Sequence, residues 1–234
     1  YMSELICGPA ILFAPAGRAE IIPKAASKAD MVIIDLEDGA GEVDREVAYR
    51  NIRESGLDPK RTIVRTVGPS DPHFLADVEM VKSTDFTLVM VPKLLGSVPE
   101  ELDGLNIIAM IETPQAATSI PQIAADPKVV GMFWGAEDLT HLLGGTHSRF
   151  LGDESNEGSY RDTMRLTRAL MHLHAAANGK FTIDAIHADF HDEEGLYLEA
   201  VDAARTGFAG TACIHPKQIE TVRKAYRPEA GQLE

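Results

Sequence analysis

Cysteine is scarce in this sequence of 234 residues, and other features that would mark a function class are also missing. Cys7 and Cys213 are its only cysteines, too few for a disulfide framework or a thiolate metal cluster. No apolar run approaches the roughly 20 residues that span a bilayer. The N-terminus lacks the basic and then apolar segments of a secretory signal. These absences favour a protein of the reducing cytoplasm with no membrane partner.

Positive charge is also sparse. The chain has 22 Lys and Arg against 36 Asp and Glu, a formal net charge of −14, and its basic residues form no cluster longer than two. Proteins that bind phosphate backbones have such clusters, so we expect no nucleic acid partner. The acidic excess indicates either a solvated surface or a site that collects a divalent cation, and only the placement of the carboxylates distinguishes these two.

Eight short apolar runs recur along the chain, each continuous rather than alternating. Such runs are typical of strands buried on both faces of a parallel sheet. They occupy residues 10–15, 31–36, 62–67, 86–91, 106–111, 129–134, 181–186 and 208–214.

Amphipathic helical patterns lie between these runs. They include residues 42–55, 71–83, 113–125, 159–178 and 193–207. Pro114 and Pro216 stand at first-turn positions, and Gly179 and Gly207 follow last apolar residues as C-terminal caps do. Eight strands alternating with helices predict a single α/β domain over residues 2–234, a (β/α)₈ TIM barrel. The pattern favours this barrel over an open doubly wound sheet.

One irregular segment, "LGGTHSRFLGDESNEG" at residues 143–158, separates the sixth strand unit from a long helix. In a barrel it would lie at the active end. Either a mobile cover or a solvated surface excursion explains its composition.

Charged residues follow nearly every predicted strand. Active sites of (β/α)₈ barrels lie at the C-terminal ends of the strands. The residues at or just beyond these ends are Arg18, Glu37, Asp38, Arg65, Lys93, Glu112, Glu137, Asp138, Asp184 and His215. A helix cap or a surface charge explains any one of them, but acids and bases that meet at one mouth predict an active site.

Two of these acids suggest a metal. Glu112 and Asp138 end sequential strands, which are neighbours in this fold, so their carboxylates can share an ion. Carboxylates without His or Cys beside them are the ligands that Mg²⁺ prefers. Arg65 offers a cationic fork for a substrate carboxylate or an enolate.

Histidine and nucleotide sites have weaker support. His172 and His174 are two apart on a long helix and cannot share a face. His187 and His191 straddle a strand-to-helix loop, which favours a loop role over a zinc site. The chain has no G-x-S-x-G, P-loop or G-x-G-x-x-G motif, so serine acyl transfer and the usual nucleotide folds lack support.

Several segments together resemble the citrate lyase β-subunit-like family, within the HpcH/HpaI aldolase superfamily. "DLEDG", "GAEDL" and "CIHPKQI" in this order are specific, and the likeness covers nearly the whole chain. The other matching segments are "LFAPAGRAE", "IVRTVG", "VMVPK", "AMIETPQA" and "IDAIHADFHDEEGL".

The resemblance implies a (β/α)₈ barrel that assembles into homotrimers or hexamers and uses Mg²⁺ to break or form a carbon–carbon bond in a coenzyme A thioester. It implies that Glu112 and Asp138 bind the metal and that Arg65 binds substrate and stabilises the enolate. Glu37 and Asp38 match acids that hold metal-bound water.

Two further matches concern the substrate. The backbone around Gly135, Ala136 and Glu137 matches a cradle for the keto acid carboxylate. Arg18 and the "PAG" before it match a segment near the coenzyme A phosphates.

The chain departs from the family pattern at two points. Many relatives place an acid from a C-terminal extension over a neighbouring subunit's site, to protonate the enolate. This chain stops soon after "VRKAYRPEAGQLE", so it resembles the short stand-alone branch or lacks its tail, and the general acid is unassigned. Many relatives also have Asp-Arg-Pro where Gly17, Arg18 and Ala19 stand here.

The leading hypothesis is a Mg²⁺-dependent lyase that cleaves a citryl-, citramalyl- or malyl-type thioester into a keto acid, such as oxaloacetate or pyruvate, and acetyl-CoA. The substrate is expected to be a free coenzyme A ester. A malate synthase-like condensation, a thioesterase, a non-catalytic barrel that binds Mg²⁺ and a keto acid, and an aldolase that uses aldehydes without coenzyme A stay open as alternatives.

Overall fold

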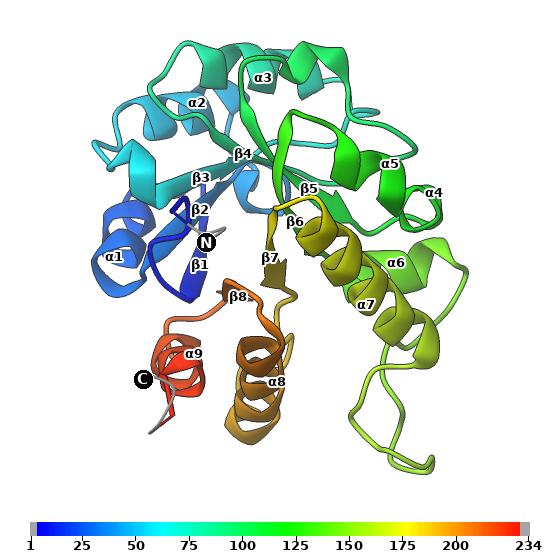
Figure 1. Ribbon diagram of the computed structural model, residues 1–234. Coiled ribbons are helices and arrows are strands. Elements are labelled where there is room, and N and C mark those ends of the chain that lie inside the picture. Colours follow the sequence, from blue (N-terminus) through cyan, green and yellow to red (C-terminus); the bar gives the residue numbers. More distant parts are fainter. Residues whose placement is uncertain (1–3, 230–234) are drawn as a thin grey trace.

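The structure of the chain, a computed structural model, describes residues 4–229 (Figure 1). The expected domain, residues 2–234, therefore ends outside the described residues on both sides. Eight parallel strands form one closed barrel in chain order. They are β1 (Ala10–Pro15), β2 (Met31–Asp35), β3 (Thr62–Arg65), β4 (Leu88–Val91), β5 (Asn106–Ile111), β6 (Val129–Trp134), β7 (Phe181–Asp184) and β8 (Gly210–Cys213). The predicted (β/α)₈ barrel is confirmed.

Closure of the sheet depends on the pairing of its last strand with its first. Ile11 of β1 pairs with Met31 of β2 on one side and with Ala212 of β8 on the other. On its far side, β8 pairs with β7 through Gly210 and Ile183. An open doubly wound sheet would leave two unpaired edge strands, so that alternative is wrong.

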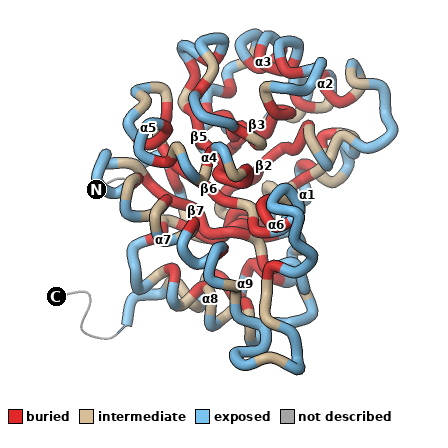
Figure 2. The backbone as a smooth tube through the Cα atoms, turned by 90° about the vertical axis from the view of Figure 1, so that its right-hand side faces the viewer, coloured by how far each residue is buried: buried red, intermediate tan, exposed pale blue. Residues whose placement is uncertain are grey.

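Successive residues of each strand point to opposite sides of the barrel wall. In β2, Met31 and Ile33 belong to a buried cluster made almost entirely of strand residues, which fills the barrel. Val32 and Ile34 belong to a second cluster, shared with the surrounding helices. Figure 2 shows the buried strands at the centre and the exposed turns of the helices around them. The same alternation turns Asp35 toward the barrel axis.

Helices surround the barrel (Figure 1). They are α1 (Ile21–Lys28), α2 (Arg45–Arg53), α3 (Phe74–Lys82), α4 (Pro114–Ala117), α5 (Ile120–Ala125), α6 (Ala136–Leu142), α7 (Asp162–Ala177), α8 (Glu193–Thr206) and α9 (Gln218–Tyr226). Three of them, α1, α6 and α9, lie outside the helical ranges read from the sequence.

The strand predictions hold to within two residues at each end. The runs at 10–15, 106–111 and 129–134 match the observed strands, and the other five extend one or two residues too far. Apolar side chains continue beyond the ends of β7 and β8 for another reason, since Ile186 and Ile214 line the pocket described below.

One predicted helix is wrong. The pattern at 113–125 forms two short helices, α4 and α5, with Pro121 in the first turn of α5. In a continuous helix the ring of Pro121 would clash with the carbonyl of Ala117, four residues earlier.

The predicted helix ends are mostly confirmed. Pro114 is the first residue of α4. Gly207 caps α8 in the left-handed conformation, at φ +99°, and Gly179 follows α7 at φ +71°. Pro216 precedes α9 by two residues instead of occupying its first turn. Between Glu4 and Glu229, no helix combines the length and the apolar character that crossing a bilayer requires.

Candidate active site

A pocket of about 350 Å³ opens at the C-terminal ends of the strands. Arg65, Glu112 and Asp138 all line it, as do Phe13 of β1 and Ile186 beyond β7. These residues are far apart in the sequence and meet because every strand of a parallel barrel ends at the same rim. The expected convergence of acids and bases is therefore found.

Arg65 ends β3 inside the barrel and is 6% exposed. Its Nε and Nη2 donate to the two carboxylate oxygens of Asp35, at 2.8 and 2.7 Å, and its guanidinium lies over the ring of Phe13 at 4.8 Å. Burial lowers the pKa of Arg65, but the hydrogen bonds and charge of Asp35 raise it further, so the group stays cationic. Its Nη1 lies 3.3 Å from Glu37 Oε1 and 3.9 Å from Met110 Sδ.

Asp35 is a site residue that the sequence analysis did not select. Its carboxylate also accepts hydrogen bonds from the backbone N–H groups of Glu37, at 3.0 Å, and Gly39, at 3.1 Å. It thus fixes both Arg65 and the loop that carries Glu37 and Asp38. The signal was available, because Asp35 follows the inward residues Met31 and Ile33 at a spacing of two.

The paired acids after β2 have different surroundings. The side chain of Glu37 is 11% exposed and that of Asp38 is 79% exposed, and they lie 3.3 and 3.5 Å from the Arg65 guanidinium. Glu37 Oε2 accepts a hydrogen bond from Lys93 Nζ at 2.7 Å. Its Oε1 is buried without a hydrogen bond. Burial raises the pKa of Glu37, against the opposing charges of Arg65 and Lys93.

Glu112, directly after β5, is 1% exposed. Its Oε2 accepts a hydrogen bond from the backbone N–H of Lys93 at 2.9 Å. Burial, and then the charge and hydrogen bonding of Asp138, raise the pKa of Glu112. The two carboxylates thus meet as expected, and the charge of Asp138 disfavours ionisation of Glu112.

The turn from β6 into α6 brings its residues against Glu112. A Cβ on Gly135 would lie 2.6 Å from Glu112 Oε1, so only glycine lets the Glu112 carboxylate occupy this place. The N–H of Gly135 donates to Ile111 O at 3.2 Å and is not free to hold a ligand. The other N–H groups of the expected cradle are those of Ala136 and Glu137. They lie in the first turn of α6, where backbone N–H groups have no partner within the helix.

Glu137 also connects the site to the irregular segment. Its Oε1 accepts a hydrogen bond from the hydroxyl of Ser148 at 2.6 Å. The next residue, Arg149, bonds to Glu199 of α8 and lies 3.8 Å over the ring of Tyr160. None of residues 143–158 lines the pocket, and Ser148 and Arg149 anchor this segment to α6 and α8.

The Glu112 and Asp138 carboxylates fit a hard divalent cation. Both are oxygen donors, no His or Cys lines the pocket, and a cation between them would relieve the repulsion that raises the pKa of Glu112. Residues 4–229 contain no group of three or more His, Cys, Asp or Glu that could hold a metal alone. Waters and ligand oxygens would complete the shell, and Glu37 Oε1 is an open acceptor for such a water.

Other residues predicted at the rim lie elsewhere. The side chain of Arg18 is 63% exposed and pairs with Glu20 at 2.9 Å, outside the pocket. Asp184 has the outward register of β7 and accepts hydrogen bonds from Trp134 Nε1 at 2.9 Å and Arg168 at 3.0 Å. A place for Asp184 at the rim was therefore wrong, because one step along a strand reverses the side chain. His215 stacks on Phe190 at 4.5 Å.

His172 and His187 make hydrogen bonds between elements of the fold. His187 lies between Asp192 and Glu199, with ring nitrogens at 2.9 and 3.1 Å from their oxygens. His172 contacts the hydroxyl of Thr182 at 2.7 Å and the carbonyl of Thr206 at 2.6 Å. The preference for non-metal roles agrees with these contacts.

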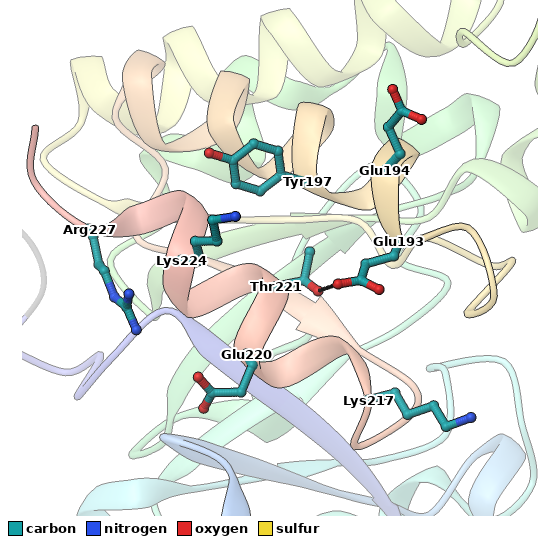
Figure 3. A pocket seen from close by; sticks show the side chains of 8 residues that line it. All are labelled: Glu193, Glu194, Tyr197, Lys217, Glu220, Thr221, Lys224 and Arg227. Carbon is teal, nitrogen blue, oxygen red and sulfur yellow. Dashed lines mark hydrogen bonds between the residues drawn. The ribbon is translucent and has the colours of Figure 1, made fainter.

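A second hollow of about 600 Å³ lies on the outer wall between α8 and α9 (Figure 3). Its side chains are of mixed charge, and Glu193 accepts a hydrogen bond from Thr221 at 3.5 Å. Because no strand-end residue reaches it, the pocket at the rim is the candidate active site.

The model of the HpcH/HpaI aldolase/citrate lyase family matches residues 10–216. The chain belongs to this family. Among its relatives within the family, the citrate lyase subunit beta-like protein of Mycobacterium tuberculosis is 45% identical over 233 residues, covering 99% of this chain and 84% of that protein. A (3S)-malyl-CoA thioesterase of Cereibacter sphaeroides is 30% identical over 235 residues, covering 96% and 79%.

A similar solved structure is the crystal structure of protein CitE from M. tuberculosis in complex with magnesium, acetoacetate and coenzyme A. It has a TM-score of 0.90 and 45% sequence identity, covering 97% of this chain and 83% of that one. The barrel and the course of the chain are thus common to both.

Proposed function

We propose that this protein is a Mg²⁺-dependent carbon–carbon lyase that cleaves a hydroxyacyl-CoA thioester of the citryl, citramalyl or malyl type. The products are a keto acid and acetyl-CoA. The observation that carries this proposal is the meeting of the Glu112 and Asp138 carboxylates with the Arg65 guanidinium in one pocket. The complex of CitE with magnesium, acetoacetate and coenzyme A supports it.

Glu112 and Asp138 would hold the magnesium ion, which supplies Lewis-acid polarisation of the substrate oxygens. The β-hydroxyl of the substrate would release its proton to water, and the electron pair of the broken C–C bond would pass to the thioester carbonyl, giving the keto acid and an enolate. Arg65, held by Asp35, would stabilise this developing charge with its guanidinium. A proton taken up from water by the enolate carbon would give acetyl-CoA.

The substrate carboxylate would lie against the N–H groups of Ala136 and Glu137 at the start of α6. Arg18 would bind a coenzyme A phosphate in exchange for its exposed pairing with Glu20. Homo-oligomeric assembly as a trimer or hexamer, a cytoplasmic location and a single domain over residues 2–234 stay predictions.

Product analysis tests the proposal. The purified protein is incubated with Mg²⁺ and, separately, citramalyl-CoA, malyl-CoA and citryl-CoA, and the products are identified by mass spectrometry. We expect a keto acid and acetyl-CoA in equal amounts from one of them, and loss of turnover in Glu112→Gln. Tight binding of oxaloacetate or pyruvate without turnover of any thioester would instead make the protein a non-catalytic binding barrel.

Hydrolysis is the second candidate, favoured by the 30% identity to (3S)-malyl-CoA thioesterase. In that reaction water attacks the thioester carbonyl and the C–S bond breaks, releasing malate and free coenzyme A. A thiol reagent detects free coenzyme A but not acetyl-CoA. Thiol release in step with malate would assign hydrolysis, and its absence during keto acid formation would assign the lyase.

A further inference from the structure

Lys93 has an unusual backbone conformation at the edge of the proposed metal site. Its φ is +52°, and among residues 4–229 the only other non-glycine residue with positive φ is Asn156. Asparagine adopts this region readily and lysine does not. Strained conformations of this kind persist where the surroundings hold them and are frequent at functional sites.

The contacts of Lys93 show what this conformation achieves. Its backbone N–H donates to Glu112 Oε2 at 2.9 Å, and its Nζ donates to Glu37 Oε2 at 2.7 Å. The same Nζ lies 3.7 Å from Asp138 Oδ2. Space for the residue comes from Gly68, where a Cβ would approach the Cβ of Lys93 to 3.0 Å. One residue thus touches all three carboxylates.

The charges around these carboxylates need a counter-cation. Glu37, Glu112 and Asp138 are held together around this one lysine. The other nearby cation, Arg65, has two of its three nitrogens on Asp35 and the third 3.3 Å from Glu37. The ammonium of Lys93 is therefore the positive group closest to the two proposed metal ligands.

We propose that Lys93 is a built-in counter-cation that neutralises the carboxylate site and is displaced from Asp138 when a divalent cation binds. The inference rests on the proposed magnesium site and adds a residue that sets its affinity. A divalent ion beside an ammonium is repelled by it. Lys93 thus stabilises the folded protein in the absence of Mg²⁺ and lowers the affinity of the carboxylate site for Mg²⁺.

Two substitutions separate charge from shape. Lys93→Gln removes the charge and keeps an unbranched side chain, so the strain at positive φ is unchanged. Lys93→Arg keeps the positive charge on a long unbranched side chain and is the matched control. Mg²⁺ binding to metal-free protein is measured by calorimetry, and thermal unfolding is followed in EDTA and in saturating Mg²⁺.

We expect Lys93→Gln to bind Mg²⁺ about tenfold more tightly than the wild type, and Lys93→Arg to bind it within about threefold of the wild type. In EDTA, Lys93→Gln should melt at a lower temperature than either, and Mg²⁺ should raise its melting temperature the most. Equal or weaker binding by Lys93→Gln would overturn the counter-cation role while leaving the magnesium site intact. No Mg²⁺ binding by the wild type would overturn both.

A measurement on the wild-type protein keeps the proposal testable if Lys93→Gln does not fold. Lysines are methylated reductively with and without Mg²⁺, and the rate at each position is read by mass spectrometry. Displacement of the ammonium predicts faster labelling of Lys93 in Mg²⁺, with no change at Lys28, which is exposed at the C-terminal end of α1. An unchanged or slower rate at Lys93 contradicts the proposal.

Discussion

Arg65 depends on Asp35 for both its orientation and its charge. The two hydrogen bonds fix the plane of the guanidinium, and the carboxylate neutralises a cation that is 6% exposed. A fixed donor stabilises a developing negative charge without reorganising first. Asp35 therefore acts as a positioning residue for the proposed chemistry.

Asp35→Asn should destabilise the protein by about 3 kcal/mol, because it leaves a buried guanidinium without its carboxylate. Urea unfolding measures this loss. Glu220→Gln, which removes the exposed partner of Arg223 on α9, is the control and should change stability by less than about 0.5 kcal/mol. Equal effects of the two substitutions would contradict a special role for Asp35.

Gly135→Ala should weaken Mg²⁺ binding about tenfold or more, the usual effect of disturbing the neighbours of a metal ligand. The added Cβ would lie 2.6 Å from Glu112 Oε1 and push that carboxylate away. Gly96→Ala is the matched control, since its Cβ would meet nothing closer than 3.7 Å. Calorimetric titration with MgCl₂ compares them, and equal affinities would show that Glu112 moves without consequence.

At the scale of single residues, the sequence best predicts charged residues that interrupt or end an apolar run. Glu112 directly follows the run 106–111 and Asp138 follows the run 129–134 by four residues, whereas Arg65 is the one charge within the run 62–67. Asp35 also lies within a run, where only the inward register reveals its role. The sequence places Lys93 at the rim, but its contacts with three carboxylates depend on a backbone conformation that no sequence pattern predicts.

Among the elements, the irregular segment is held at two adjacent positions. Ser148 bonds to Glu137 in the pocket wall, and Arg149 bonds to Glu199 of α8. Glu199 in turn contacts His187 in the loop after β7. These contacts join α6, the segment and α8 in one polar chain beside the rim.

The pH dependence of stability should report on this chain. Burial lowers the pKa of His187, but hydrogen bonds and charge from Glu199 and Asp192 raise it above its ordinary value overall. The charged ring is thus favoured by folding, so its contribution is fully present below about pH 6.5. It is lost as pH rises through the folded-state pKa.

His187→Gln should accordingly lose less stability than the wild type between pH 6 and pH 8. The pKa values of Glu199 and Asp192 are lowered. Both carboxylates therefore stay ionised in this interval and do not contribute to the difference between the two pH profiles. His73→Gln, at an exposed position before α3, should follow the wild type. If the pH profile of stability is the same for the wild type and for His187→Gln, His187 does not cause the pH dependence.

Element types were predictable where apolar residues form a short continuous run, as they do for all eight strands. The break between α4 and α5 was less predictable, because Pro121 is compatible both with the first turn of a new helix and with a kink in a continuous one. The sequence pattern does not predict α6, because Glu137 and Asp138 are interpreted as the polar end of β6.

For the molecule as a whole, closure of the barrel makes each strand depend on both neighbours. A chain that ends at Gly207 lacks β8 and α9, leaving the backbone edges of β1 and β7 unpaired. We expect it to aggregate without a cooperative melting transition, since exposed strand edges pair with other chains.

Light scattering and circular dichroism check this expectation. Tyr226→Phe in the full chain is the control, because it removes only the hydrogen bond between the hydroxyls of Tyr226 and Thr211. It should stay folded with a loss of about 1 kcal/mol. A soluble, cooperatively melting chain without β8 would show that the remaining strands close by themselves.

The division of the rim between charged and apolar strands has a consequence for how the protein can evolve. The charged residues that line the pocket come from β2, β3, the segments directly after β2 and β5, and α6, whereas β1 and the loops after β7 and β8 supply Phe13, Ile186 and Ile214. Mutations on the apolar side can alter the size of the ligand that fits without disturbing the ionic groups. Single substitutions on the apolar side can then change which ligand fits, while each intermediate protein keeps the ionic groups of the site.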